Sequence, residues 1–289
     1  AAFRSSLAGA GSPVGAAETA GAQAAAQSPS PAQPSATPRA GTPGSGAPQS
    51  GAARSAPRSA AARSAAAALR LILSAERLYA EHGLDGVSLR QISAAAGHGN
   101  NNAVQYHFGS KDGLIQAIIA HRLPAIDRRR TELLAAARAA GTDRDVRVLI
   151  DVLMRPLAEE ARDPSSHYVR FIGRMSQLPL ERNPWWGTGQ PASEVAYEVT
   201  LLIMEQLTHL PLALRQLRLR HATMFCLTAL ATQDGAARAA AGDHPADPAL
   251  ELPYEVFVAD LFDMATAGLL APMSETARQL LPPDTTPAS

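Results

Sequence analysis

A polar segment at residues 97–114, GHGNNNAVQYHFGSKDGL, gathers amide, phenol, imidazole and ammonium groups within a chain rich in alanine and arginine. Its lysine, Lys111, is the only one in the sequence. The amides of asparagine and glutamine present a donor and an acceptor together, which matches the N6 and N7 edge of adenine in the DNA major groove. Tyr106, His107 and Lys111 can donate hydrogen bonds to phosphate oxygens. This combination indicates contact with a nucleic acid.

A short helix across residues 101–107 would give these groups a common direction. Residues three and four positions apart lie on one side of a helix, so Val104 and Phe108 share an apolar face. The opposite face carries Asn101, Asn102, Gln105 and Tyr106. We expect Asn100 to be the N-cap residue, because asparagine favours that position. Taken singly, each residue has a plainer interpretation, since an asparagine run can be only a loop and a lone histidine is usually a half-buried side chain.

Capping signals define the helices that must hold this segment. Apolar residues recur at helical spacing from Ala66 onward, and Gly83 supplies a helix stop. Ser88 then acts as an N-cap with Gln91 three positions on, which is a capping box, and Gly97 supplies a second stop. Short helices joined by tight turns, followed by the polar helix, describe a helix-turn-helix.

The rest of the sequence shows helical periods interrupted by proline and glycine, without the alternation typical of strands. The expected helices are 110–140, 144–162, 165–177, 193–209, 211–238 and 254–270. We therefore predict an all-α fold with an N-terminal three-helix head at residues 66–123 and a larger helical bundle at residues 124–271.

The stretches RLILSAERLYAEHGLDGVSLRQISAAAG and AVQYHFGSKDGL resemble the N-terminal domain of tetracycline-repressor (TetR) family regulators. The resemblance covers about residues 68–123. It rests on a glycine after the first helix, a serine opening the second, and the string Tyr-His-Phe followed by Ser-Lys-Asp and Leu. It implies a sequence-specific DNA-binding transcriptional regulator, a repressor released from a palindromic operator in double-stranded DNA by a small-molecule effector.

The resemblance also implies which residues meet DNA. At the third helix, which lies in the major groove in the family, the matching positions are Asn101, Asn102, Ala103, Gln105, Tyr106 and His107. Ser88 and Arg90 at the start of the second helix, and Lys111 at the start of the fourth, would hold the DNA backbone. The turn before the third helix is one residue longer than is usual in the family, which bears on the cap at Asn100 and on the register of the helix.

Two segments of the predicted bundle, 222–231 and 256–270, are apolar nearly all round, which predicts burial on several sides. The resemblance implies that the last two helices form a four-helix homodimer bundle, and an intrachain core is the alternative. It also implies a pocket for a small apolar or amphipathic effector among the middle helices. The candidates for this pocket are Phe171, Met175, Trp185, Trp186 and Ile203. Their alternative role is ordinary core or loop packing.

Both ends of the chain are predicted to be unstructured. Residues 1–65 consist mainly of Ala, Gly, Pro, Ser and Gln, which bury too little surface to offset the entropy of ordering, and residues 272–289 are predicted to be a flexible tail. The first tail ends with Arg54, Arg58 and Arg63. They belong either to a solvated linker or to an arm that touches DNA phosphates or the minor groove.

Composition limits the remaining functions. The formal net charge is +0, from 26 Lys and Arg against 26 Asp and Glu, so a DNA partner must be held by a local patch. No catalytic or metal-ligating constellation stands out, and we expect no enzyme activity, no cofactor and no metal. The single cysteine, Cys226, cannot form an intrachain disulfide. With no apolar run long enough to span a membrane, we expect a cytoplasmic protein without a membrane partner.

A second function is compatible with these observations. Residues 66–123 hold five Lys or Arg against four Asp or Glu, which is a thin positive margin for a DNA-binding head. The alternative is an all-helical ligand-binding or adaptor protein with a helix-turn-helix that does not bind DNA. The dependence of binding on salt distinguishes the two, because only contacts with phosphates release counterions.

Overall fold

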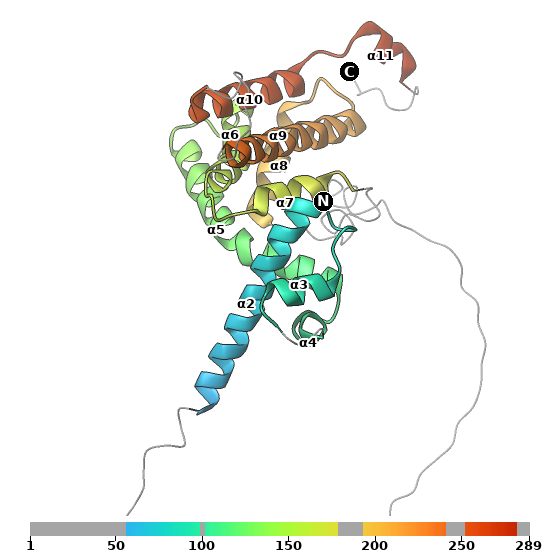
Figure 1. The fold of residues 1–289 in the computed structure, drawn as a ribbon. Helices are drawn as coiled ribbons and strands as arrows, with labels where there is room; N and C mark the ends of the chain where they lie inside the picture. The colour runs from blue at the N-terminus through green and yellow to red at the C-terminus, as the bar shows by residue number, and fades with distance from the viewer. Residues whose placement is uncertain (1–55, 99–101, 179–192, 241–251, 282–289) are drawn as a thin grey trace, which may run out of the picture. The chain divides into compact units, whose positions relative to one another are not determined.

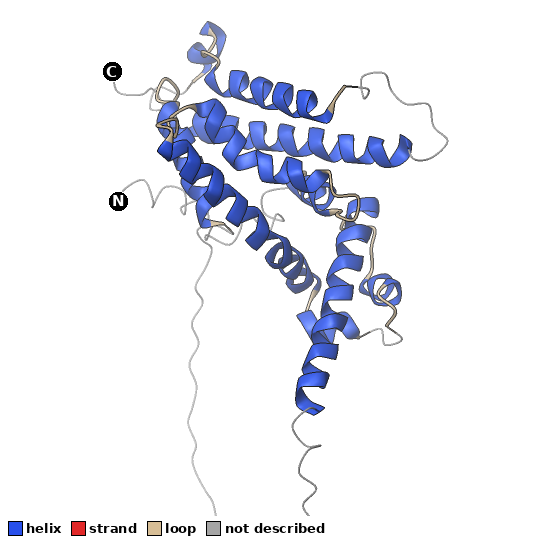
Figure 2. Cartoon of the chain, turned by 90° about the vertical axis from the view of Figure 1, so that its left-hand side faces the viewer, coloured by secondary structure: helices blue, strands red, loops and turns tan. Residues whose placement is uncertain are grey.

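The computed structural model describes residues 56–98, 102–178, 193–240 and 252–281. Every regular element within these ranges is an α-helix, which confirms the predicted all-α fold (Figures 1 and 2). None of these helices combines the length and the apolar character that crossing a lipid bilayer requires. The chain divides into two units, Ala1–Ala62 and Arg63–Ser289, and all packing described below lies within the second.

The described part of the chain holds ten helices. In chain order they are α2 (Ala56–His82), α3 (Leu89–Ala95), α4 (Ala103–Phe108), α5 (Lys111–Ala139), α6 (Val146–Ala161), α7 (Tyr168–Ser176), α8 (Glu194–Gln206), α9 (Leu212–Ala240), α10 (Tyr254–Leu270) and α11 (Glu275–Leu280). Helices α5 and α6 continue through internal prolines, Pro124 and Pro156.

The predicted capping signals set the helix ends in the head. The Ser88 hydroxyl accepts a hydrogen bond from the Gln91 backbone, and the Gln91 side chain accepts one from the Ser88 backbone, so the capping box before α3 is confirmed. Gly83 after α2 and Gly97 after α3 have φ angles of 75° and 73°. A residue with a side chain rarely adopts that left-handed conformation, which explains why both stops are glycines.

The head, formed by α2 to α4 and the start of α5, has an apolar centre. Helix α4 packs against α3 and α5. The fully buried side chains of this centre come from all four helices: Leu71, Ala75, Tyr79, Ile92, Val104, Leu114 and Ile118. Each of the short helices α3 and α4 is only six or seven residues long and would not be stable alone, so this shared core holds them in place.

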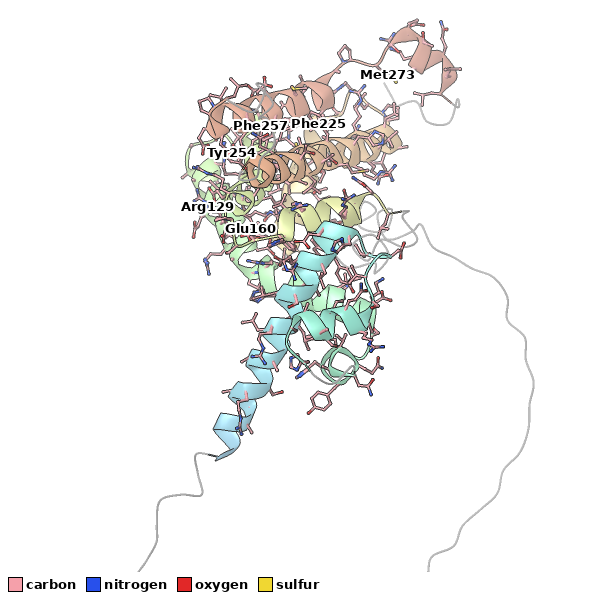
Figure 3. All side chains as sticks on the ribbon, viewed as in Figure 1. Arg129, Glu160, Phe225, Tyr254, Phe257 and Met273 are labelled. Atoms are coloured by element: carbon pink, nitrogen blue, oxygen red, sulfur yellow. The ribbon has the colours of Figure 1, made fainter. Side chains whose placement is uncertain are left out.

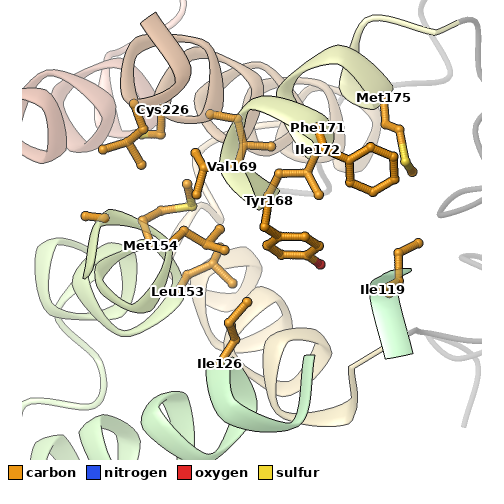
Figure 4. Close-up of a cluster of buried hydrophobic side chains, with 14 of the residues drawn as sticks. Ile119, Ile126, Leu153, Met154, Tyr168, Val169, Phe171, Ile172, Met175 and Cys226 are labelled. Atoms are coloured by element: carbon orange, nitrogen blue, oxygen red, sulfur yellow. The ribbon is translucent and has the colours of Figure 1, made fainter. Parts of the chain in front are cut away.

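The bundle, formed by the rest of α5 and by α6 to α10, has a second apolar centre. Helix α9 packs against α7 and α10, while α6 packs against α5, α8 and α10. Figure 4 shows side chains of α5, α6, α7 and α9 converging on this centre, among them Ile126, Met154, Tyr168 and Cys226. The helices predicted for the bundle are therefore present, with ends that differ by a few residues at most.

Both chain ends depart from the prediction where the structure describes them. Helix α2 begins at Ala56 rather than Ala66, because a run of alanines, the best helix former, extends a helix that is already anchored by packing. Helix α11 occupies part of the segment predicted to be a flexible tail, with Ser274 capping its first turn. Arg54 and the rest of residues 1–55 lie outside the described residues.

Candidate nucleic-acid interface

Helix α4 has one buried and one exposed face. Val104 is fully buried and Phe108 is partly buried against the head core, whereas Gln105 is exposed and Tyr106 has 82% of its surface accessible. His107 lies between the two faces and meets the edge of the Tyr106 ring, with centroids 5.0 Å apart. The apolar back and polar front expected from the spacing are therefore present.

The start of α4 differs from the prediction. Its N-cap residue is Asn102, which is exposed, and not Asn100. Asn100 and Asn101 lie outside the described residues. The backbone carbonyl of Asn102 accepts the first helical hydrogen bond, from the Tyr106 amide at 2.9 Å. Asn102 and Gln105 therefore occupy the first turn of the helix.

Ala103 does not belong to the exposed face. Only 7% of its surface is accessible, and it lies in the hydrophobic core of the head beside Val104. Because α4 is just six residues long, its first helical residue must help to anchor it, and the methyl group of Ala103 fills that role. A contact between its side chain and a DNA base, as predicted from the resemblance, is not compatible with this burial.

The start of α3 presents two of the predicted backbone contacts. The Ser88 hydroxyl donates a hydrogen bond to Gln91 Oε1 at 2.8 Å and accepts one from the Gln91 amide at 3.3 Å, so its first task is to cap the helix. Arg90, the second residue of α3, is exposed and makes no ion pair with the described residues. A guanidinium in that state is available to an anion such as a phosphate.

Lys111 has a different setting from the one expected. Its ammonium donates a hydrogen bond to the backbone carbonyl of Leu84, in the turn between α2 and α3. It also lies over the ring of Tyr79, 5.7 Å from the centroid, and the residue is partly buried. Lys111 therefore fastens the start of α5 to the α2–α3 turn. Because an ammonium has three donors, this contact leaves capacity for an outer partner.

Gly113 makes the turn between α4 and α5 possible. A Cβ atom at this position would lie 2.1 Å from the Phe108 carbonyl oxygen. Ser110 caps α5 by accepting a hydrogen bond from the Gly113 amide at 3.0 Å. The close approach of these backbones sets the angle at which α4 leaves the head, and only glycine fits it.

A buried ion pair joins the head to the bundle, and sequence reasoning missed it. Glu76 of α2 is 1% exposed, and its carboxylate accepts two hydrogen bonds of 2.8 Å from Arg122 of α5. It also accepts one of 3.0 Å from the amide of His167, just before α7. Arg122 reaches Glu160 of α6 at 3.1 Å as well. The sequence does hold one signal of this pair. Glu76 lies on the same face of α2 as the apolar residues Ile72 and Ala80, which indicates a carboxylate that faces the interior.

The electrostatics of this pair favour its charged form. Burial acts to lower the pKa of Arg122, but hydrogen bonding and the charge of Glu76 outweigh it, so the net direction of the pKa is upward. Close by, burial and then the charge of Asp112 raise the pKa of Tyr79 to about 12. The Tyr79 hydroxyl is buried without a hydrogen-bond partner among the described residues, and its ring stacks on Phe171 of α7 at 6.2 Å.

Comparison with known proteins decides the nature of the head. A family model described as bacterial regulatory proteins of the tetR family matches residues 71–118, from Leu71 in α2 to Ile118 in the second turn of α5. The chain carries the N-terminal domain of the TetR family. No curated protein matches the chain. The match to the TetR family model supports a DNA-binding transcriptional regulator, as the sequence motifs predicted.

The residues predicted for an effector pocket behind the TetR domain have mixed placements. Phe171, Met175 and Ile203 are fully buried and belong to the core of the bundle. Trp185 and Trp186 lie outside the described residues. The three buried side chains therefore pack against their neighbours, which is the alternative that the sequence left open.

A surface groove of about 630 Å³ lies between α5 and α8 of the bundle. Its lining combines apolar and charged side chains: Asp127, Thr131, Leu134, Ala135, Arg138, Glu194, Val195 and Glu198. Next to it, Arg130 is buried and donates hydrogen bonds to Asp127 at 3.0 Å and to the Leu153 carbonyl at 3.2 Å. Burial lowers the pKa of Arg130, against the charge of Asp127. Because apolar and charged residues are mixed along this lining, no regular spacing of apolar residues marks the groove in the sequence.

Proposed function

We propose that the protein is a transcriptional repressor that binds a palindromic operator as a homodimer and is released by a small-molecule effector. The observation that carries the proposal is the structure of α4, in which a buried Val104 backs an exposed Gln105 and Tyr106. A helix held in this way can enter the major groove without losing core packing. The match of residues 71–118 to the TetR family model supports the same interpretation.

The residues proposed to contact DNA are those described residues of the head that have exposed or partly exposed polar side chains. Asn102 and Gln105 present their amides to base edges, Tyr106 and His107 donate to phosphates, and Arg90 holds the backbone beside α3. Amide side chains pair with adenine in two hydrogen bonds, so we expect A·T pairs in each half-site. Lys111 contributes mainly by fixing α5 against the α2–α3 turn.

The dimer is proposed to form through α9 and α10. Large apolar side chains are exposed on these helices, with Phe225 at 41%, Val256 at 49%, Met264 at 53% and Leu270 at 46%. Helix α9 packs against α10, and Figure 3 labels Phe225 on the first and Tyr254 and Phe257 on the second. Exposed apolar patches of this kind mark interfaces. A two-fold dimer meets two half-sites related by the same symmetry, which is why a palindrome is expected.

The effector is proposed to be small and amphipathic. The groove between α5 and α8 has the size of a small-molecule site, with Leu134 and Val195 as apolar lining and Arg138 and Glu198 at polar positions. Helix α5 runs from Lys111 in the head to Ala139 beyond this groove, so it connects the two sites directly. A ligand can release DNA only if it binds the released state more tightly than the bound state.

Selection of bound duplexes from a random library by the purified full-length protein tests the DNA-binding part of the proposal. We expect enrichment of one motif with two inverted halves about a helical turn or more apart. Enrichment of a motif without symmetry would contradict the dimer, and no enrichment would contradict DNA recognition. Gel-shift titrations of the selected duplex with small amphipathic compounds then test release. If none raises the dissociation constant, the effector part fails.

The alternative function, an adaptor protein that does not bind DNA, is based on the near-neutral charge of the head. In the structure Glu76 is paired with Arg122 and Glu81 with Arg77, so two acids and two arginines cancel, and Arg70, Arg90 and Lys111 stand against Asp85 and Asp112. An adaptor would show no dependence of DNA affinity on salt. A DNA-binding head shows a steep log-log slope that follows the number of phosphates neutralised.

A further inference from the structure

The first described turns of α2 in the second unit project beyond the core of the head. Residues 63–66, 69 and 70 are exposed, and Leu71 is the first buried residue of this helix from Ala60 onward, where burial is described. From Arg63 to Leu71 the axial rise amounts to about 12 Å at 1.5 Å per residue. This length of helix does not contribute to the apolar centre of the head, so its sequence has another task.

Two arginines in this stretch point in one direction. Arg63 and Arg70 are seven residues apart, which is close to two full turns, so they share a face of α2. Both are exposed, and neither forms an ion pair with the described residues. The sequence holds no Asp or Glu between Glu18 and Glu76, so the stretch has no acid of its own to neutralise them.

The charges of the head are segregated. Glu76 forms an ion pair with Arg122 at the junction with the bundle, and Glu81 forms one with Arg77 in α2 at 3.1 Å. Three arginines that make no ion pair with described residues, Arg63, Arg70 and Arg90, are left on the exposed surface of α2 and α3. The exposed acids Asp85 and Asp112 lie in the α2–α3 turn and at the start of α5, so the exposed stretch of α2 before Leu71 carries positive charge only, which attracts a phosphate backbone.

The projecting stretch lies at the end of the head that also carries α4. In Figures 1 and 2, two views 90° apart, this part of α2 and the helix α4 both lie away from α6, α9 and α10. A duplex seated on the exposed face of α4 would therefore run close to Arg63 and Arg70.

We infer that the projecting stretch of α2 is a second DNA-binding element, in which Arg63 and Arg70 bind phosphates outside the base pairs that α4 reads. The inference rests on the proposed DNA-binding function and adds to it a longer, sequence-independent footprint. At 3.4 Å of axial rise per base pair, a reach of about 12 Å corresponds to about three or four base pairs beside each half-site.

Two duplexes and two variants test this element. The selected operator is prepared as a short duplex that ends at the recognised motif and as a long one with about six base pairs of arbitrary sequence on each side, more than the expected reach. The variant is R63Q/R70Q in the full-length chain. The matched control is R128Q/R174Q, which removes two exposed arginines of the bundle that also form no ion pair with described residues. Unfolding midpoints of both variants check that the fold is kept.

The wild type and the control should bind the long duplex more tightly than the short one, and the R63Q/R70Q variant should bind both with the affinity of the short duplex. On the long duplex its log-log salt slope should be less steep by about 1.8 for each subunit bound, since each phosphate that an arginine neutralises adds about 0.9 to the slope. Between about 50 and 200 mM salt, this amounts to about a tenfold smaller fall in affinity for each subunit.

Other outcomes overturn the inference in distinguishable ways. If the variant matches the wild type in affinity and slope on the long duplex, Arg63 and Arg70 do not bind DNA. If it loses the same affinity on both duplexes, the two arginines bind within the motif and not beside it. If the wild type itself binds no duplex, the proposed DNA-binding function fails, and this inference fails with it.

Discussion

Arg122 of α5 donates two hydrogen bonds of 2.8 Å to the carboxylate of Glu76 in α2, and Glu76 is almost completely buried. The same carboxylate accepts the His167 amide at the start of α7. Three helices that carry the head and the bundle therefore meet at one charged group. Any rotation of the head relative to the bundle must break or rearrange these hydrogen bonds.

Loss of this carboxylate should destabilise the protein strongly. Glu76→Gln leaves the Arg122 guanidinium partly buried with one acid fewer, and we expect the free energy of unfolding to fall by roughly 3 kcal/mol, as is typical when one member of a buried pair is removed. Urea denaturation followed by circular dichroism measures this change. The control is Glu81→Gln, which breaks the more exposed pair with Arg77 and should cost less than about 1 kcal/mol. Equal costs for both variants would show that Glu76 is not a junction.

Tyr79 should make the protein sensitive to alkaline pH. Its pKa is raised from 10.0 to about 12 in the folded state, so between these values the unfolded chain loses the proton while the folded chain keeps it. The contribution is fully present below pH 10 and is lost as the pH rises towards 12, so the free energy of unfolding falls across that window. Unfolding curves at several pH values should show this fall, and Tyr79→Phe should reduce it. A Tyr79→Phe variant with an unchanged pH profile would contradict the assignment.

The same variant should be well tolerated at neutral pH. The Tyr79 hydroxyl is buried without a hydrogen-bond partner among the described residues, so removing it relieves an unsatisfied group and leaves the ring on Phe171. We expect Tyr79→Phe to change the free energy of unfolding at pH 7 by less than about 1 kcal/mol, or to raise it. A large loss at pH 7 would mean that the hydroxyl has a partner.

Gly113→Ala should disturb α4 through the backbone alone. The added Cβ would lie 2.1 Å from the Phe108 carbonyl oxygen, so the turn between α4 and α5 must open. We expect a loss of DNA affinity on every sequence and a fall in the free energy of unfolding of roughly 2 kcal/mol, in the usual range for an overpacked site. Gln116→Ala, at an exposed site of the same helix, is the control and should stay within about 0.5 kcal/mol of the wild type. Normal DNA binding by Gly113→Ala would show that this turn does not set the position of α4.

Two variants on α3 and α4 should separate base recognition from binding to the DNA backbone. Gln105→Ala removes an exposed amide from α4 and should change the preference among selected duplexes, by about 1 to 3 kcal/mol for a bidentate hydrogen-bond pair. Arg90→Ala should weaken binding to all duplexes alike and reduce the salt slope by about 1. Competition binding with point-substituted operators measures both. Equal losses on specific and random duplexes from the two variants would contradict these roles.

Met264→Glu tests the proposed dimer surface on α10. Met264 is 53% exposed, so a charge there is harmless in a monomer but would be buried between two subunits. We expect a monomer in analytical ultracentrifugation and weaker binding to the full palindrome, with unchanged helicity. Ala136→Glu, at an exposed position of α5, should keep the state of the wild type. If the Met264→Glu protein has the same oligomeric state as the wild type, the interface lies elsewhere.

Much of this architecture could be predicted because the signals are local. Ser88 with Gln91, and Ser110 before α5, are short-range hydrogen-bond patterns, and Gly83 and Gly97 meet a local backbone requirement. The two faces of α4 follow from helical spacing, and Val104 and Gln105 lie on opposite sides accordingly. Signals of this kind depend on residues a few positions apart, so they can be recognised in the sequence alone.

Other features depend on partners that are distant in the sequence. Glu76 and Arg122 are 46 residues apart, and nothing around either residue indicates that they meet. The hydrogen bond from Lys111 to the Leu84 carbonyl involves a backbone atom, which carries no sequence signature. The family resemblance assigns Ala103 to the exposed face, whereas its burial depends on how α4 packs on α5. Tertiary packing therefore decides these three roles.

Cys226, at the centre of the bundle, is the sole thiol of the chain, and burial raises its pKa to about 12. Only the thiolate reacts readily with maleimides and methanethiosulfonates, so this residue should stay inert to them in the native protein. A cysteine introduced on α4 or α10 would then accept a fluorophore or spin label selectively, with no need for a cysteine-free background. Distances between such labels would show whether two subunits associate in solution and how far apart their α4 helices lie.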